Sequence, residues 1–170
     1  MPEPVQEPVQ QPVEAAALFE LARTAPACGM VPVPPHLAAT PEGCFLHAMG
    51  MRLTHIGAGR ARAEMALTAL HLNQRGGPQG GALAAFADAT AGWASDGALP
   101  AGNFTTLDLT CHLLGRADAG TVLVAEARPV HLGRNAIVQQ VDVFAAEQEG
   151  AVSRRLTASF TCTQIVLAPR

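Results

Sequence analysis

The alternation of polar and apolar residues after residue 58 predicts several strands that each bury one face. In residues 59–68, charged side chains at positions 60, 62 and 64 alternate with alanine, methionine and leucine, which is the period of a half-buried strand. Residues 105–113 alternate in the same way and place Thr106 and Asp108 on one polar face. Three further β-rich runs follow, at residues 121–132, 136–145 and 154–166. Glycines separate these runs, so the pattern predicts consecutive antiparallel hairpins or meanders.

One segment, residues 81–95, interrupts this alternation. It is rich in alanine, contains no proline and is apolar on all sides, which predicts a helix that is buried on most of its surface. Asp88 is the only ionisable residue between Arg75 and Asp96. A buried helix, with at least one strand before it and four after it, predicts an α+β fold in which one antiparallel sheet curls around the helix.

The first 41 residues differ in composition from the rest of the chain. Residues 1–13 contain four prolines and are predicted to be disordered. Residues 14–24 consist of good helix formers and predict a short helix. Residues 26–41 contain five prolines and predict a linker or an extended wrap. We therefore expect a proline-rich tail with a short helix over 1–41 and the main domain over 42–170.

The composition limits the partners that the chain is expected to have. Hydrophobic residues make up 49% of it and charged residues 15%, so part of the surface is expected to lie against another subunit. The net charge of −3, without an arginine cluster, argues against nucleic-acid binding. No apolar run approaches the roughly 20 residues of a membrane span, and the acidic start does not resemble a signal peptide. The four cysteines and six histidines match no metal-ligand spacing. We therefore expect a cytoplasmic protein with no metal and no nucleic-acid or membrane partner.

Asp88 is the first candidate for a functional residue. A carboxylate inside an apolar helix costs several kcal/mol unless it is paired, hydrogen-bonded or hydrated. Ionisable groups in such places are often functional. The alternative is that Asp88 faces a gap filled by solvent or caps a neighbouring backbone segment.

The glycine-rich turn at residues 75–81 is the second candidate. It holds four glycines around Pro78 and directly precedes the predicted helix. The first N–H groups of a helix have no partner within the helix and lie at the positive end of its dipole. They can therefore hold an anion or polarise a carbonyl oxygen. A plain strand-to-helix turn is the alternative.

The residues around this turn resemble the motif of a known family. They run His71-Leu72-Asn73, then Gly76 or Gly77, then Gln79-Gly80-Gly81, then Ala87-Asp88-Ala89. This order resembles the hotdog-fold acyl-CoA thioesterases of the phenylacetate-pathway, or PaaI-like, type. The motif of that family is Asn or Gln, Gly, His-Gly-Gly and an acid at the spacing of Asp88. Residues 120–127 and 133–135 are similar to the strand and turn that follow the helix in that family. The resemblance covers roughly residues 50–163.

The resemblance implies a fold, a reaction and an assembly. The fold is an α+β hotdog fold, in which an antiparallel sheet of five or six strands wraps around one long central helix. The reaction is hydrolysis of an acyl-CoA thioester to a free acid and CoA. CoA would then be part of the substrate, and no cofactor is implied. The assembly would be a homodimer or a homotetramer.

The resemblance also implies roles for single residues. Gly80 would offer its backbone N–H to the thioester carbonyl, and Asp88 would act as nucleophile or general base. Asn73 would position the carbonyl or the attacking water. Gln79 stands where the family usually has histidine and can still donate a hydrogen bond. The residues implied to bind the substrate and its CoA moiety are Gly81, Gly133, Arg134 and Asn135.

The spacing of Gly80 and Asp88 limits how both residues could act on the same carbonyl group. Eight residues span about 12 Å along one helix, whereas a reacting carbonyl must lie about 3 Å from both its donor and its attacker. A second helix, antiparallel across a two-fold axis, would bring Asp88 of one subunit to Gly80 of the other. We therefore expect a homo-oligomer with a site shared between two subunits.

Two functions remain open from the sequence. Asp88 and Asn73 favour an acyl-CoA thioesterase. Gln79 favours a non-catalytic hotdog module that binds acyl-CoA or a lipid-like ligand, because an amide cannot exchange a proton near neutral pH. Ala91 and Gly92 favour the same alternative, since many family members carry a hydroxyl at one of these positions. Release of free thiol from acyl-CoA would separate the two functions.

Overall fold

The computed structural model describes residues 14–100, 102–146 and 154–167. Within these residues one antiparallel sheet has the strand order β1-β2-β3-β5-β6-β7-β4. Its strands are β1 (Val31–Pro32), β2 (Met51–Gly57), β3 (Arg60–Ala66), β4 (Phe104–Leu113), β5 (Val122–Leu132), β6 (Ala136–Ala146) and β7 (Arg154–Val166). The helices are α1 (Glu14–Ala22), α2 (Pro35–Ala38), α3 (Phe45–Ala48) and α4 (Gly80–Asp96), with a 3-10 turn at Ala69–His71.

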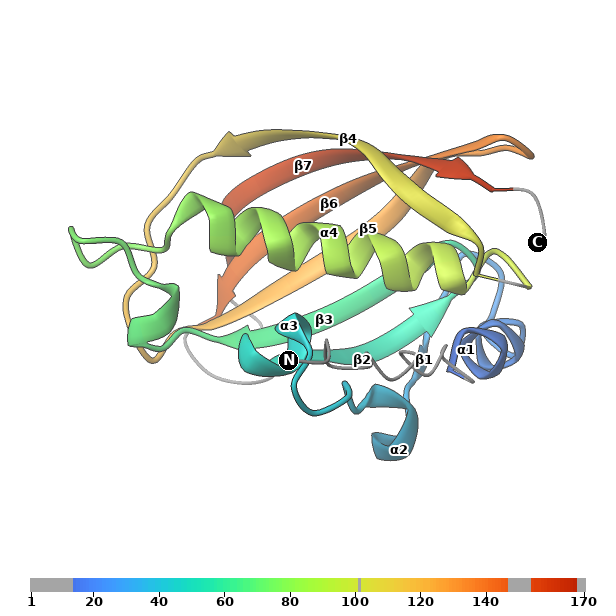
Figure 1. Ribbon diagram of the computed structural model, residues 1–170, viewed down its shortest axis with the longest axis horizontal. Helices are drawn as coiled ribbons and strands as arrows, with labels where there is room; N and C mark the ends of the chain where they lie inside the picture. The colour runs from blue at the N-terminus through green and yellow to red at the C-terminus, as the bar shows by residue number, and fades with distance from the viewer. Residues whose placement is uncertain (1–13, 101, 147–153, 168–170) are drawn as a thin grey trace, which may run out of the picture.

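The predicted hotdog fold is confirmed. Figure 1 shows the sheet curled around α4, which packs against β3, β5 and β6. The apolar side chains of α4 lie inside this curl, and Phe86, Ala87 and Ala91 are completely buried. The helix extends one residue beyond the predicted range at each end. Six long strands form the sheet over the described residues, and the two-residue β1 adds a short edge strand.

A bulge in β4 changes the predicted faces of that strand. Thr106 lies opposite Gln164 of β7, but Asp108 lies opposite Thr163, so the register shifts between Thr106 and Asp108. A bulge inserts one residue and reverses the alternation beyond it. Thr106 therefore faces α4, whereas Asp108 faces away from it. The predicted common polar face for these two residues is wrong for this reason.

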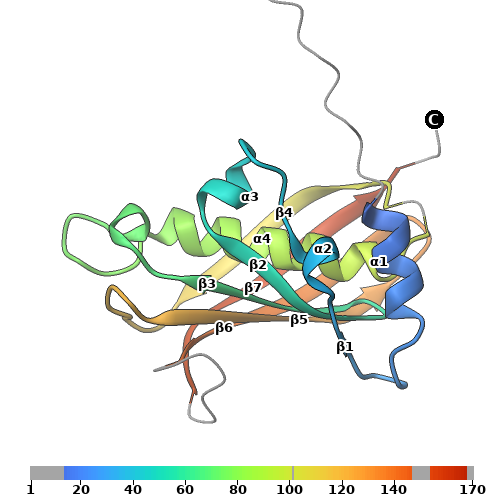
Figure 2. The same ribbon diagram turned by 90° about the horizontal axis from the view of Figure 1, so that it is seen from below.

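Residues 14–41 pack closely on the sheet and on α4. Leu18 and Ala22 of α1 are buried in the core, so the predicted short helix is present and docked, although it ends at Ala22. The segment predicted as a linker or wrap contains β1, which pairs with β2, and α2 (Figure 2). The disorder predicted for 1–13 lies outside the described residues. The division of the chain at residue 42 stays a prediction.

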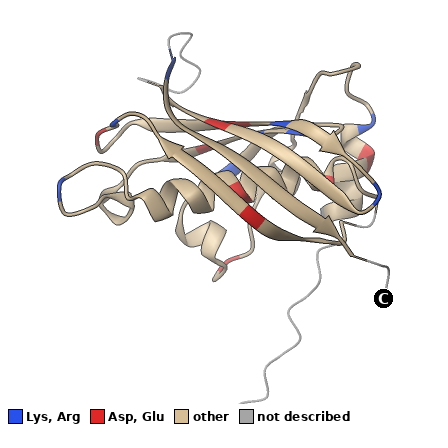
Figure 3. Cartoon of the chain, turned by 90° about the horizontal axis from the view of Figure 1, so that it is seen from above, with Lys and Arg blue, Asp and Glu red and all other residues tan. Residues whose placement is uncertain are grey.

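Charged side chains are sparse on this fold. Figure 3 shows the basic residues separated from one another, with acidic residues between them. In the part of the chain that the structure describes, no helix is both long enough and apolar enough to cross a membrane.

Candidate active site

Asp88 lies on α4 where the helix faces β4 and β7. Thr106 Oγ1 donates a hydrogen bond to Asp88 Oδ1 over 2.7 Å, and Cys162 Sγ lies 3.8 Å from the same oxygen. The carboxylate is half-buried, and no described residue donates to its second oxygen, Oδ2. One oxygen is therefore fixed by the protein, and the other is available to a bound molecule.

Cys162 is a buried thiol whose chemistry Asp88 affects. Burial, followed by the negative charge of Asp88, raises the pKa of Cys162 from 9.0 to about 12. The thiol therefore keeps its proton at neutral pH and can donate weakly to the carboxylate. Because the thiolate is the nucleophilic form of cysteine, Cys162 is expected to be unreactive in the folded protein.

Thiol labelling should separate Cys162 from the exposed cysteines. At pH 8 we expect iodoacetamide to modify Cys28 and Cys111, which are exposed, and to leave Cys162 unmodified until the protein is unfolded in urea. Peptide mass spectrometry measures this directly. The pKa of Cys162 is higher in the folded protein than its ordinary value of 9.0. The free energy of unfolding should therefore decrease as the pH rises from 9.0 toward about 12. Rapid labelling of Cys162 in the native protein would contradict this account.

A cavity of about 320 Å³ lies beside Asp88, between α4, β4 and the residues of α3. Its apolar wall includes Phe45, Trp93 and Phe104. Ala89 and Gly92 leave space on the helix side, because neither carries a large side chain. A concave apolar site with a carboxylate in its wall suits a ligand whose apolar group lies next to a reactive bond.

Gln164 adds a buried donor to this wall. Its Oε1 accepts a hydrogen bond from the Ser95 hydroxyl, and its Nε2 has no partner among the described residues. Buried polar groups are usually hydrogen-bonded, so an amide N–H without a partner in a cavity wall is a potential contact for a bound molecule.

The glycine-rich turn places backbone donors at the start of α4. Gly80 and Gly81 are the first two residues of the helix, and the Gln79 side chain does not cap them. Gln79 is exposed, and its backbone N–H donates to His71 O over 2.8 Å. His71 is buried, with Nε2 3.0 Å from Met49 O. The start of α4 is therefore held through the backbone, and the Gln79 side chain leaves the first N–H groups of the helix uncapped.

Asn73 closes the turn internally. Its Oδ1 accepts from the Arg75 N–H, and its Nδ2 donates to Pro78 O. The backbone between these residues passes through Gly76, whose φ of +75° suits glycine. Asn73 thus shapes the loop before α4, and a contact of its side chain with a substrate stays a prediction.

One chain does not bring the predicted site residues together. Gly80 and Asp88 lie on the same helix, about 12 Å apart along its axis. The turn between β5 and β6, which contains residues 133–135, lies at the other end of α4 from Gly80 in Figure 1. Gly133 donates to Ala136 O, and Arg134 and Asn135 are exposed.

Sequence reasoning missed the residues that contact Asp88 from the sheet. Thr106 supplies a hydroxyl from β4, whereas the resemblance placed the usual hydroxyl on the helix at Ala91 or Gly92. Cys162 is 74 positions from Asp88 in the sequence. Contacts of this range depend on strand register, and no local pattern indicates them.

Comparison with known proteins agrees with this geometry. Residues 80–152 match the model of the thioesterase superfamily. A variant of the phenylacetic acid degradation protein PaaI from Thermus thermophilus is 28% identical, with a TM-score of 0.64 over 72% of this chain and 98% of that one. The predicted resemblance to PaaI-like hotdog thioesterases is confirmed. No curated protein matches the chain.

Two further solved structures extend the comparison. A hypothetical thioesterase from Streptococcus pneumoniae, solved with coenzyme A, is 25% identical, with a TM-score of 0.62 over 71% of this chain and 88% of that one. PaaI from Escherichia coli is 23% identical, with a TM-score of 0.64 over 72% of this chain and 83% of that one, and shows the shared fold. Together with the superfamily match, these similarities support a thioesterase-type hydrolase activity.

Proposed function

We propose that the protein hydrolyses an acyl-CoA thioester to a free acid and CoA, with Asp88 as nucleophile or general base. The proposal rests on the hydrogen bonding and the surroundings of the Asp88 carboxylate. One oxygen is fixed by Thr106, and the other is unpartnered beside an apolar cavity. A reacting carboxylate needs this combination of fixed orientation and access to the substrate.

The reaction follows from the groups that meet at this cavity. Asp88 either removes a proton from a water that attacks the thioester carbon, or attacks that carbon itself. Negative charge then develops on the carbonyl oxygen, and the Gly80 N–H at a helix start can stabilise it. The C–S bond breaks and CoA leaves as a thiolate, which takes up a proton from the Asp88 carboxyl in the first route and from water in the second. In the second route, water then hydrolyses the acyl-aspartyl intermediate.

A second subunit would complete the site, and the free edge of the sheet supports this assembly. Within residues 14–100, 102–146 and 154–167, β4 is the last strand of the sheet and pairs with β7 on one side only. Leu107 at its bulge is 70% exposed, and Leu113, which lies near Gly80, is 55% exposed. An exposed apolar edge strand is a template for pairing with another chain. A two-fold pair of β4 strands would place two α4 helices antiparallel, as the shared site requires.

The CoA portion is expected at the exposed turn of residues 133–135. Arg134 carries a charge and several donors there, and both suit phosphate groups. The coenzyme A in the S. pneumoniae relative supports a CoA ligand in general. The apolar cavity beside Asp88 would take the acyl group.

A panel of acyl-CoAs tests this function. We expect the purified protein to release CoA from at least one straight-chain or aromatic acyl-CoA, because both fit an apolar cavity of about 320 Å³. Product should be measured by chromatography, since the protein's exposed Cys28 and Cys111 would react with a thiol dye. Tight binding of acyl-CoA without any CoA release would favour the non-catalytic module, for which Gln79 in place of histidine is the supporting observation.

A further inference from the structure

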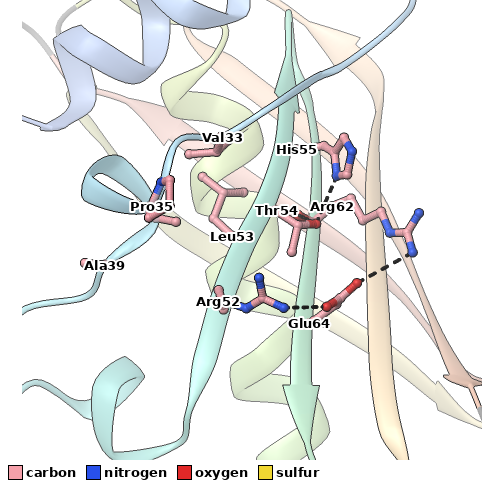
Figure 4. Close-up of a pocket in the computed structure, with 10 residues that line it drawn as sticks. Val33, Pro35, Ala39, Arg52, Leu53, Thr54, His55, Arg62 and Glu64 are labelled. Atoms are coloured by element: carbon pink, nitrogen blue, oxygen red, sulfur yellow. Dashed lines mark hydrogen bonds and ion pairs between the residues drawn. The ribbon is translucent and has the colours of Figure 1, made fainter. Parts of the chain in front are cut away.

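Figure 4 shows a second cavity, of about 670 Å³, which shares no lining residue with the cavity beside Asp88. One wall comes from the segment between β1 and residue 39 and contains Val33, Pro35 and Ala39. The other wall comes from β2 and β3 and contains charged residues. On β3 the alanines at 61 and 63 are buried in the core around α4, so the alternating charged residues lie on the opposite face of the sheet from Asp88.

The charged wall is built around Glu64. This carboxylate is only 8% exposed and accepts a hydrogen bond from Arg52 Nη2 over 2.8 Å. Arg62 Nη2 lies 3.6 Å from its other oxygen, which is an ion pair but too long for a hydrogen bond. Two guanidinium groups therefore share the Glu64 carboxylate. Burial and, next, the charge of Arg62 lower the pKa of His55, which favours its neutral form.

Arg62 has a buried donor without an acceptor among the described residues. Its side chain is three-quarters buried, and its Nε is buried with no hydrogen-bond partner in the described part of the chain. Glu126 lies opposite it on β5 but pairs with Arg154. A buried guanidinium N–H without an acceptor is unusual, because it has lost its hydration and gained no hydrogen bond in return. Its planar fork matches a carboxylate, which can accept two parallel hydrogen bonds.

We propose that this cavity binds a monocarboxylic acid with an apolar chain. Arg62 would donate to the carboxylate, and Val33, Pro35 and Leu53 would contact the chain. The volume lies in the range of small-molecule sites. The proposal of a binding site depends on the geometry of this cavity and not on the proposed hydrolase function. The natural ligand would be the free acid that acyl-CoA hydrolysis releases, and this assignment rests on the proposed function.

Titration calorimetry with octanoate on the full chain tests this site. We expect binding that weakens at least tenfold in Arg62→Met, which keeps the apolar stem and removes the donors. Arg60→Met is the matched control, because Arg60 lies on the same strand and face but outside the cavity; it should bind normally. Ala39→Phe, which fills the cavity from the other wall, should also abolish binding without altering any charge.

Three further measurements can overturn the proposal. Asp88→Asn should bind octanoate like the unmodified protein, and a loss of binding there would place the acid in the candidate active site. Octanol should bind much more weakly, and equal binding would exclude a role for the carboxylate. Inorganic phosphate binding as tightly as octanoate would make this a general anion site. These readouts need no turnover, so they remain decisive if the protein hydrolyses no acyl-CoA.

Discussion

Replacing Asp88 with asparagine is expected to lower kcat for acyl-CoA hydrolysis at least roughly 100-fold, with KM changed only a few-fold. The substitution keeps the shape and the hydrogen bond from Thr106 but removes the charge that attacks the thioester or deprotonates water. General base catalysis contributes about 100-fold or more, which sets the lower limit. Because the loss falls on kcat, it reports an interaction of the transition state rather than substrate binding.

Asp96→Asn is the matched control for this measurement. Asp96 lines the same cavity, two helical turns further along α4. Its neutralisation changes the local charge equally but touches no proposed reacting group, so kcat should fall less than about fivefold. If Asp88→Asn kept near-normal turnover, or if both variants lost activity equally, Asp88 would not have the proposed role.

Placing a charge on the free edge of β4 is expected to separate the subunits and abolish activity. Leu107→Arg introduces the charge at an exposed position, and a two-fold interface presents it twice. Separated chains hold Gly80 and Asp88 about 12 Å apart. We therefore expect monomers in sedimentation velocity and at least about a 100-fold loss of kcat, comparable with removal of an oxyanion donor. Val130→Arg, an equally prominent exposed site on β5, should leave the assembly intact.

Subunit mixing would identify which chain supplies each group. Gly80→Pro removes the N–H at the first position of α4, where proline is tolerated. Alone, both this variant and Asp88→Asn should be inactive. A mixed dimer would contain one complete site, formed by Asp88 of one chain and Gly80 of the other, so activity should return after mixing. An active monomer, or no recovery in proven mixed dimers, would contradict the shared site.

The sequence predicted the elements with strong periodicity and failed where the register mattered. The apolar run of α4 and the alternation in β3 were sufficient to predict these two elements, because each pattern depends only on neighbouring residues in the chain. The bulge that turns Thr106 toward Asp88 has no signal in the alternation of β4. The proline-rich segment before residue 42 gave no sign of β1, because two residues carry no measurable period.

The residues of the candidate site were likewise predicted only where the signal is local in the sequence. Asp88 and the glycine turn were found because an isolated acid and clustered glycines are visible locally. The hydroxyl of Thr106, the thiol of Cys162 and the buried amide of Gln164 come from distant strands. The cavity containing Arg62 also needs two segments to fold together before its walls exist.

The open start of α4 also carries a thermodynamic cost. A serine, threonine or aspartate at the position of Gln79 would typically contribute about 0.5–2 kcal/mol to stability by accepting hydrogen bonds from the first turn of the helix. The Gln79 side chain makes no such hydrogen bond. The turn before α4 is instead held by hydrogen bonds to His71 O and from the Asn73 side chain. In the proposed reaction, a substrate oxygen would therefore meet N–H groups that the Gln79 side chain does not occupy. Selection for greater heat resistance at this position would act against selection for binding.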